Sequence, residues 1–344
     1  MVSFALVQLS KKHTEIFGSF LEIFIKNEWD FYIYYDKDDD NYTFVNYYQK
    51  LFNTKFNIRA GKELMEYKNA HDFYIFTSSA DDVRMDEYFK QPSMANKCIF
   101  VNHQAPHWKP YMHKNILMSP VIKSSELDKE QCATIVPIYR EYKKLHSNPN
   151  QTIIAIVGAI HKQAKDINLL KDVLEKHAGK DFTFYIFMRR MDWKAVVQTN
   201  AFLKNNPHIQ VHSGLTTEKM MEKLKEVKFI WPLSKQGGWF YWQRLTGAIP
   251  LAINLNMPLV IDKKLAKIYD MESCCILYNK QLSEIMDEII QLPKDKYFNL
   301  IENAVIYKKL IAKRNTKEFV NLCLSQVEMQ EKNDLKIFQY LNSI

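Results

Sequence analysis

One stretch of the chain, residues 227–262, sets the fold that the rest can take. An apolar run at 227–232 predicts a buried strand, and a turn with two adjacent glycines follows it. The sequence then predicts a helix over about 244–255 and a second buried strand over 259–261. Strand, glycine turn, helix and strand in this order form one unit of a parallel α/β sheet.

Such a unit is suited to binding an anion. A helix N-terminus presents unpaired backbone N–H groups and a partial positive charge. Thr246 and Gly247 lie near the predicted helix start, and Arg244 beside them can hold two phosphate oxygens in a bidentate fork. A diphosphate would dock there. The alternative is that the glycines only turn the chain and Arg244 is a solvated surface charge.

The first half of the chain also alternates predicted strands with predicted helices. Strands are predicted over 3–9, 30–35, 56–58, 72–77 and 97–102, and helices over 13–26, 42–52 and 62–68. Because these strands lack polar alternation, they indicate a parallel sheet that is covered on both faces. Ligands bind beyond the carboxyl ends of such strands. The candidate loops therefore contain His13, residues 78–82, and residues 103–107.

The second half begins after an irregular connection over 119–140 and a small polar linker over 145–152. Its predicted strands are 153–157, 182–187 and 209–211, its helices are 167–177, 193–203 and 217–226, and the tail over 294–344 is helical in pattern. A chain of 344 residues is too long for one ordinary core, which indicates two domains.

Charge and cysteine content narrow the class of partner. The net charge of +8 is dispersed along the chain, which fits an anionic small substrate or a peripheral surface contact and not a nucleic acid. The five cysteines are odd in number and form no C-x-x-C pair, so we expect free thiols and no metal site. The sequence shows no signal peptide and no apolar membrane span, so we expect a cytoplasmic protein.

Three blocks of the second half carry a family resemblance. The first is Ile156-Val157-Gly158, followed by Lys165-Asp166 and a helix. The second is VHSGL at 211–215, before a helix rich in Lys and Glu, and the third combines QRLTG at 243–247 with PLV at 258–260. In this order and spacing they resemble the GT-B glycosyltransferases, in which two Rossmann-like domains face each other across a cleft.

The resemblance implies a domain plan and an activity. A Rossmann-like acceptor-side domain would cover 1–148, a Rossmann-like donor-binding domain 149–310, and C-terminal helices over 311–344 would pack back on the first domain. The activity would be transfer of a hexosyl or pentosyl unit from a nucleoside-diphosphate sugar to a hydroxyl of a glycan or glycoconjugate. No metal or other cofactor is expected, and no nucleic-acid partner. No membrane span is expected either, but a peripheral contact with a membrane is compatible with the sequence.

The resemblance also assigns donor contacts. Lys165 and Arg244 would neutralise the departing diphosphate, because fixed cations lower the barrier where charge builds on a leaving group. Gly158 would let the backbone approach the phosphates. The other predicted donor contacts are Thr246 and Gly247 at the phosphates, Gly214 and Leu215 at the base, and Arg189 with Arg190 at the base or ribose, where surface charge is the alternative.

Three histidines are candidates on the acceptor side. His103 ends a first-domain strand, where the family often has a cleft histidine that binds the sugar or acts as a general base. A packed or solvated histidine is the alternative. His13 lies in the first strand–helix loop and would meet the acceptor or cap the helix. His107 and Trp108 are candidates to stack on a sugar ring, although core packing accounts for Trp108 better.

Two family features are missing. Retaining members carry two glutamates eight positions apart in the segment after the glycine turn, but no acidic residue lies between Glu226 and Asp262 here. The arginine often found after the first glycine is Ala159. Two other hypotheses therefore stay open. One is a GT-B-like protein that binds a nucleotide or glycan without catalysis, and the other is a sugar-nucleotide epimerase, which would need cleft carboxylates.

Overall fold

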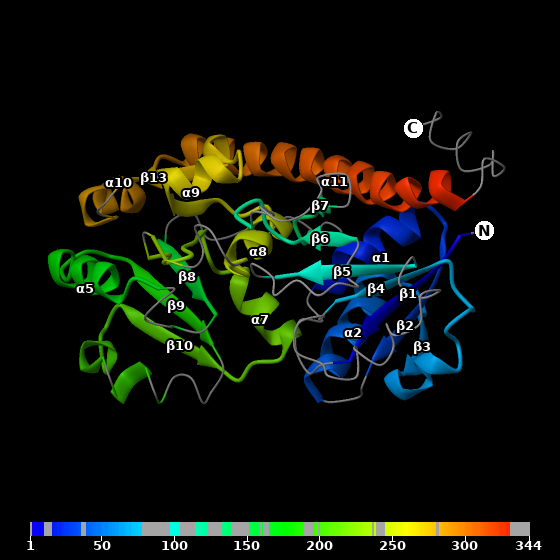
Figure 1. Cartoon of the computed structure of the whole chain (residues 1–344). Helices are drawn as coiled ribbons and strands as arrows, with labels where there is room; N and C mark the ends of the chain where they lie inside the picture. The colour runs from blue at the N-terminus through cyan, green and yellow to red at the C-terminus, as the bar shows by residue number, and fades with distance from the viewer. Residues whose placement is uncertain are drawn as a thin grey trace.

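Two parallel β-sheets and one long helix make up the protein, as a computed structural model shows (Figure 1). The predicted parallel α/β architecture with two Rossmann-like sheets is confirmed. The structure describes residues 2–9, 16–35, 39–77, 97–103, 114–122, 132–138, 151–158, 160, 165–188, 194, 196–198, 200–235, 237–238, 245–279 and 282–330.

The first sheet has seven strands, and β1, the first strand in the sequence, is the third across the sheet. Its strand order is β3 (Asn57–Ala60), β2 (Asp30–Tyr35), β1 (Ser3–Gln8), β4 (Phe73–Phe76), β5 (Cys98–Asn102), β6 (Asn115–Leu117) and β7 (Cys132–Thr134). All of these strand pairs are parallel. The connections are α1 (Phe17–Lys26), α2 (Asp39–Phe52) and the 3-10 helix η2 (Gly61–Met65). The strand order reverses between β1 and β4, which is where such sheets bind ligands.

The second sheet repeats this plan around β8. Its strand order is β10 (Ile209–Ser213), β9 (Thr183–Met188), β8 (Ile153–Val157), β11 (Phe229–Ile230), β12 (Leu259–Asp262) and β13 (Cys275–Tyr278). Its helices are α5 (Ile167–Lys176), η4 (Ala201–Leu203), α7 (Thr217–Leu224), α8 (Ala248–Asn254), α9 (Lys263–Ile268), η6 (Glu272–Cys274), η7 (Leu282–Glu284) and α10 (Met286–Ile290). The order reverses between β8 and β11.

Side-chain caps fix where three of these helices begin. The carboxylate of Asp166 accepts a hydrogen bond from the backbone N–H of Leu169 before α5, at 3.1 Å. Thr216 caps α7 with its hydroxyl, and Asp262 caps α9 with its carboxylate. These caps satisfy N–H groups that would otherwise lack an intrahelical partner. Asp262 is therefore a structural residue in this fold.

Some elements differ from the sequence expectation. The helix predicted over 244–255 begins only at Ala248, because Pro250 is tolerated within a first helical turn but not further in. The third predicted helix, 62–68, is the short 3-10 helix η2. Strand β7 lies in the connection expected to be irregular, and β6 and β13 were not predicted. Of the linker predicted over 145–152, residues 145–150 lie outside the described residues.

Helix α11 (Lys294–Gln330) runs along both sheets (Figure 1). Near its start, the hydroxyl of Tyr297 donates to the backbone O of Lys228 in the second sheet, at 3.3 Å. Further along, the side chain of Asn315 bonds the backbone N and O of Val136, two residues after β7 of the first sheet, at 3.2 and 2.7 Å. One uninterrupted helix therefore runs through position 310, where the sequence analysis placed the end of the second domain. The domain bounds given there remain predictions.

Residues Phe319 and Leu322 of α11 pack on the first half of the chain, against β1 and α1. The ring of Phe319 is fully buried, with its centroid 5.7 Å from that of Phe4 and 5.9 Å from those of Phe20 and Phe24. The ammonium of Lys114 donates to the backbone O of Leu322 at 3.3 Å. This apolar contact holds the end of the chain's long helix on the N-terminal half.

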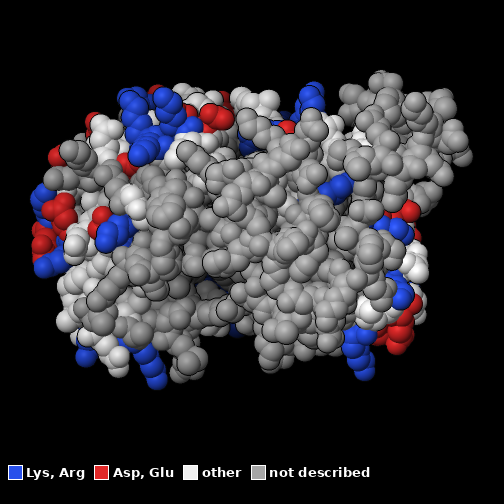
Figure 2. Space-filling model, viewed as in Figure 1, with Lys and Arg blue, Asp and Glu red and all other residues white. Residues whose placement is uncertain are grey.

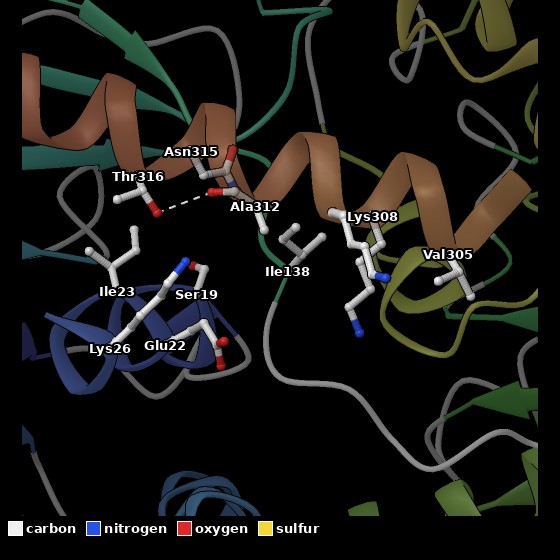
Figure 3. Close-up of a pocket in the computed structure, with 11 residues that line it drawn as sticks. Ser19, Glu22, Ile23, Lys26, Ile138, Val305, Lys308, Ala312, Asn315 and Thr316 are labelled. Atoms are coloured by element: carbon white, nitrogen blue, oxygen red, sulfur yellow. Dashed lines mark hydrogen bonds between the residues drawn. The ribbon is translucent and has the colours of Figure 1, made fainter. Parts of the chain in front are cut away.

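A cavity of about 260 Å³ lies between α1 and α11 (Figure 3). Its buried polar groups already have partners: the ammonium of Lys308 donates to the backbone O of Asn254 at 2.8 Å, and Asn315 bonds Val136. The hydroxyl of Thr316 donates to the backbone O of Ala312 at 3.1 Å. The cavity is therefore a packing gap along α11.

Candidate functional site

The ends of strands from both sheets point toward the middle of the molecule (Figure 1). In parallel α/β sheets the carboxyl ends carry the ligand sites. Direct bonds join the two halves, among them an ion pair between Lys50 and Glu218 at 2.6 Å and a bond between the hydroxyls of Ser119 and Tyr269 at 2.5 Å. The site residues predicted from sequence can therefore be placed relative to one another.

His103 follows β5, and its imidazole is fixed by neighbouring strand ends. Its Nε2 lies 2.9 Å from the backbone O of Thr77, the residue after β4. Thr77 is itself bonded to Val7 of β1 through its backbone N, at 3.0 Å. Because a carbonyl oxygen only accepts hydrogen bonds, Nε2 carries a proton. In the neutral ring Nδ1 is therefore the nitrogen that can accept a proton.

The backbone of His103 also touches the second half of the chain. Its carbonyl O accepts a hydrogen bond from the backbone N of Leu245 at 3.0 Å. Thr246 and Gly247 follow directly and lead into α8, and Thr246 is only 3% exposed. The structure thus brings His103 together with two of the residues predicted to meet the donor phosphates.

Gly158 ends β8 beside the switch point of the second sheet. Its backbone N donates to the O of Phe187 at 2.9 Å, and its φ of +92° lies in the left-handed region that favours glycine. A Cβ added there would meet no atom within 4 Å. The backbone at this strand end is therefore open to the close approach of a ligand.

Lys165 is buried between the ends of β8 and β11. Its Nζ donates to the backbone O of Val157 at 3.1 Å and to that of Pro232 at 2.5 Å, and the residue is 3% exposed. Burial lowers the pKa of Lys165 to about 7. The charge on its side chain therefore falls as the pH rises through this value. Lys165 ties together the two strand ends at which the sheet order reverses.

The loop after β10 lies next to these strand ends. The backbone N of Gly214 donates to the O of Met188 at the end of β9, at 3.2 Å, and Gly214 has a φ of +68°. Leu215 is 37% exposed, which is high for a leucine. Gly158 and Gly214 therefore flank the end of β9, as the parallel sheet requires. Six candidate site residues lie outside the described residues: His13, His107, Trp108, Arg189, Arg190 and Arg244.

Sequence reasoning missed two residues at these edges. Thr77 positions the ring of His103, and its place at the end of a predicted strand was the available signal. Ser234 pairs with Lys165 in an antiparallel bridge and is 4% exposed, and its hydroxyl has no hydrogen-bond partner in the described part of the chain. No sequence pattern marks Ser234, because its burial depends on the fold of the loop after β11.

Acidic residues near the site have structural contacts. Glu226 accepts hydrogen bonds from the hydroxyl of Tyr185 at 2.9 Å and from the ammonium of Lys223 at 2.8 Å. Within the ranges that the structure describes, no group of three or more His, Cys, Asp or Glu side chains could hold a metal ion. Among the residues that the structure describes, His103 is the histidine whose backbone bonds the segment before α8, so its imidazole lies where the two halves meet.

Comparison with known proteins identifies the fold. No family model and no curated protein matches the sequence. A glycosyltransferase from Rickettsia africae has a TM-score of 0.66 at 11% identity, with 97% of this chain and 99% of that chain covered. Anabaena HepE in complex with UDP-glucose has a TM-score of 0.61 at 10% identity, with 96% and 99% covered.

A mutant of S. aureus TarM in complex with fondaparinux, alpha-GlcNAc-glycerol and UDP is also similar. Its TM-score is 0.56 at 11% identity, with 94% of this chain and 100% of that chain covered. All three comparisons extend over both sheets. The chain therefore has the two-domain GT-B fold found in glycosyltransferases.

Proposed function

We propose that this GT-B chain transfers a hexosyl or pentosyl unit from a nucleoside-diphosphate sugar to a hydroxyl of a glycan or glycoconjugate. The hydrogen bond between the backbone N of Leu245 and the backbone O of His103 carries this proposal. It brings an imidazole and the predicted phosphate-binding segment to the same place between the two halves. A base for the acceptor and a cradle for the leaving group are the two parts that sugar transfer needs.

His103 acts in this proposal as the general base. Its Nδ1 takes the proton of the acceptor hydroxyl while the acceptor oxygen bonds to the sugar carbon and the bond to the diphosphate breaks. The carbonyl of Thr77 holds Nε2–H and so fixes the orientation of the ring. Proton transfer by a positioned side chain contributes about 10²–10⁴-fold to such rates.

Negative charge builds on the diphosphate as it leaves. We assign its neutralisation to Arg244 and Lys165, with backbone N–H groups from Gly158 and from residues 246–247. Lys165 also holds the loops after β8 and β11 together through its two carbonyl contacts. Cations of the chain take the role that a metal has in other enzymes, so the proposed reaction is metal-independent.

Two observations support the rest of the proposal. The similar structures include complexes with UDP-glucose and with UDP, which supports a nucleotide-sugar donor here. The five cysteines are all free, which supports the proposed cytoplasmic location, since thiols stay reduced there.

Arg244→Ala tests the proposal directly. We expect the wild-type protein to release nucleoside diphosphate from at least one member of a nucleotide-sugar panel. We expect Arg244→Ala to lower this rate about 10²–10³-fold, because a donor to the developing charge is lost. Lys204→Ala, an exposed cation beyond η4, serves as the matched control and should keep the rate.

A second candidate is a protein that binds nucleotide or glycan without turnover. It is favoured by the lack of any acidic residue between Glu226 and Asp262, and by the structural contacts of those two side chains. Calorimetry with nucleoside diphosphates separates the two candidates. Tight binding together with no release or transfer from any donor in the panel would support the binding protein.

A further inference from the structure

The middle of α11 is strongly basic. Between Glu302 and Glu318 the sequence has no acidic residue and five basic ones: Lys308, Lys309, Lys313, Arg314 and Lys317. These fifteen residues cover about four helical turns, or about 22 Å. A basic amphipathic helix of this kind is typical of a membrane surface or of a segment that binds a partner.

The two faces of this segment differ. Its inner face is buried against both halves of the protein by Tyr307, Ile311 and Asn315. Its outer face exposes Ile306 and Leu310, one turn apart, at 57% and 62%. Among the described residues these are the two most exposed of the large hydrophobic side chains. Exposure of two neighbouring apolar side chains to water is unfavourable, so their burial against a binding partner would be stabilising.

Lysines surround this apolar pair. Lys309, Lys313 and Lys317 are exposed on the same helix. Helix α9 ends beside it, because the hydroxyl of Tyr307 donates to the backbone O of Tyr269, the residue after α9. The side-chain amide of Asn303 also donates to the backbone O of Ser273 in η6, at 2.9 Å. Helix α9 adds three more exposed lysines: Lys263, Lys264 and Lys267. Figure 2 shows Lys and Arg side chains gathered at the upper left edge, near the place of α9 in Figure 1, with Asp and Glu side chains beside them.

These six lysines lack ion-pair partners among the described residues, whereas many lysines elsewhere are paired, such as Lys50 with Glu218. The nearby acidic side chains, Asp270, Glu272, Glu302 and Glu318, lie at the ends of the two basic segments. The surface therefore offers cations around two apolar side chains.

We propose that the outer face of α11 from Ile306 to Lys317, together with α9, docks on an anionic lipid bilayer. Ile306 and Leu310 would enter the boundary between headgroups and acyl chains, while the lysines contact lipid phosphates and carboxylates. A protein interface fits this surface less well, because lysine is depleted in such interfaces. No helix in the described ranges is long and apolar enough to cross a membrane, so the contact is peripheral.

Vesicle flotation with the full chain tests this docking, and it requires neither donor nor acceptor. We expect binding to phosphatidylcholine vesicles that contain phosphatidylserine, weakening as salt is raised. Lys309→Gln/Lys313→Gln/Lys317→Gln should weaken binding about tenfold or more, because each lysine near the surface contributes to the attraction. Ile306→Ser/Leu310→Ser should also weaken it about tenfold, because the apolar insertion is lost.

The matched control removes three positive charges from surfaces outside the proposed docking face. Lys55→Gln/Lys62→Gln/Lys204→Gln changes three exposed lysines outside this surface and should leave binding within about twofold of the wild type. The proposal is overturned if the wild type does not bind anionic vesicles, or if both triple variants lose binding equally. It is also overturned if Ile306→Ser/Leu310→Ser dissociates a dimer in analytical ultracentrifugation, because a second copy would then cover the face.

Discussion

Replacing His103 by alanine should lower the rate of sugar transfer about 10²–10⁴-fold, the contribution expected of a general base. The substitution removes the ring that Thr77 orients at the end of β5. It leaves the backbone bond from Leu245 to residue 103 in place, so the segment before α8 should keep its position. The rate is measured at saturating donor and acceptor, and nucleoside-diphosphate affinity by calorimetry should stay within about twofold of the wild type.

His103→Gln is the control that separates chemistry from positioning. Its side-chain amide can still donate a hydrogen bond to the carbonyl of Thr77, but it cannot take a proton. We expect it to be as slow as His103→Ala, because both variants lack the ring nitrogen that takes the proton. Wild-type turnover by His103→Gln would mean that the imidazole is not the base.

Replacing Phe319 by alanine should cost about 3–5 kcal/mol of the free energy of unfolding, the usual cost of truncating a buried phenylalanine. The ring is fully buried and lies against Phe4, Phe20 and Phe24, and also Trp29, all in the first half of the chain. Its loss leaves a cavity in the contact between α11 and α1. Equilibrium unfolding in urea measures the change.

Phe298→Ala is the matched control on the same helix. That ring is 45% exposed, so its truncation should cost less than about 1 kcal/mol. A cost for Phe319→Ala no larger than that for Phe298→Ala would show that the end of α11 does not pack on the first sheet in solution. The prediction that the C-terminal helices pack back on the N-terminal domain would then be wrong.

Long apolar runs made most of the fold predictable. Strands such as β1 and β9 are six buried or half-buried residues each, long enough to be recognised in a sequence. Strands β6 and β7 have three residues each, which is too short for a strand pattern to be recognised in the sequence. They are identified by their pairing with neighbouring strands in the structure. The start of α8 differs, because it depends on Pro250, which is visible in the sequence.

The site was predictable where it depends on strand ends. Gly158 and Gly214 end their strands with positive φ, and a glycine after a buried run is a visible signal. The burial of Lys165 was not visible, because its two carbonyl partners come from strand ends far apart in the sequence. The bond between Leu245 and His103 is also a product of the tertiary fold, since it joins the two halves of the chain.

Crystals soaked with UDP and with GDP would test the central claim most directly. The diphosphate should lie between Gly158 and residues 244–247, close to His103, with the base beside Leu215 and Arg244 on the phosphates. A nucleotide that fails to bind at millimolar concentration, or whose diphosphate lies away from Arg244, Thr246 and Lys165, would contradict the proposed donor site.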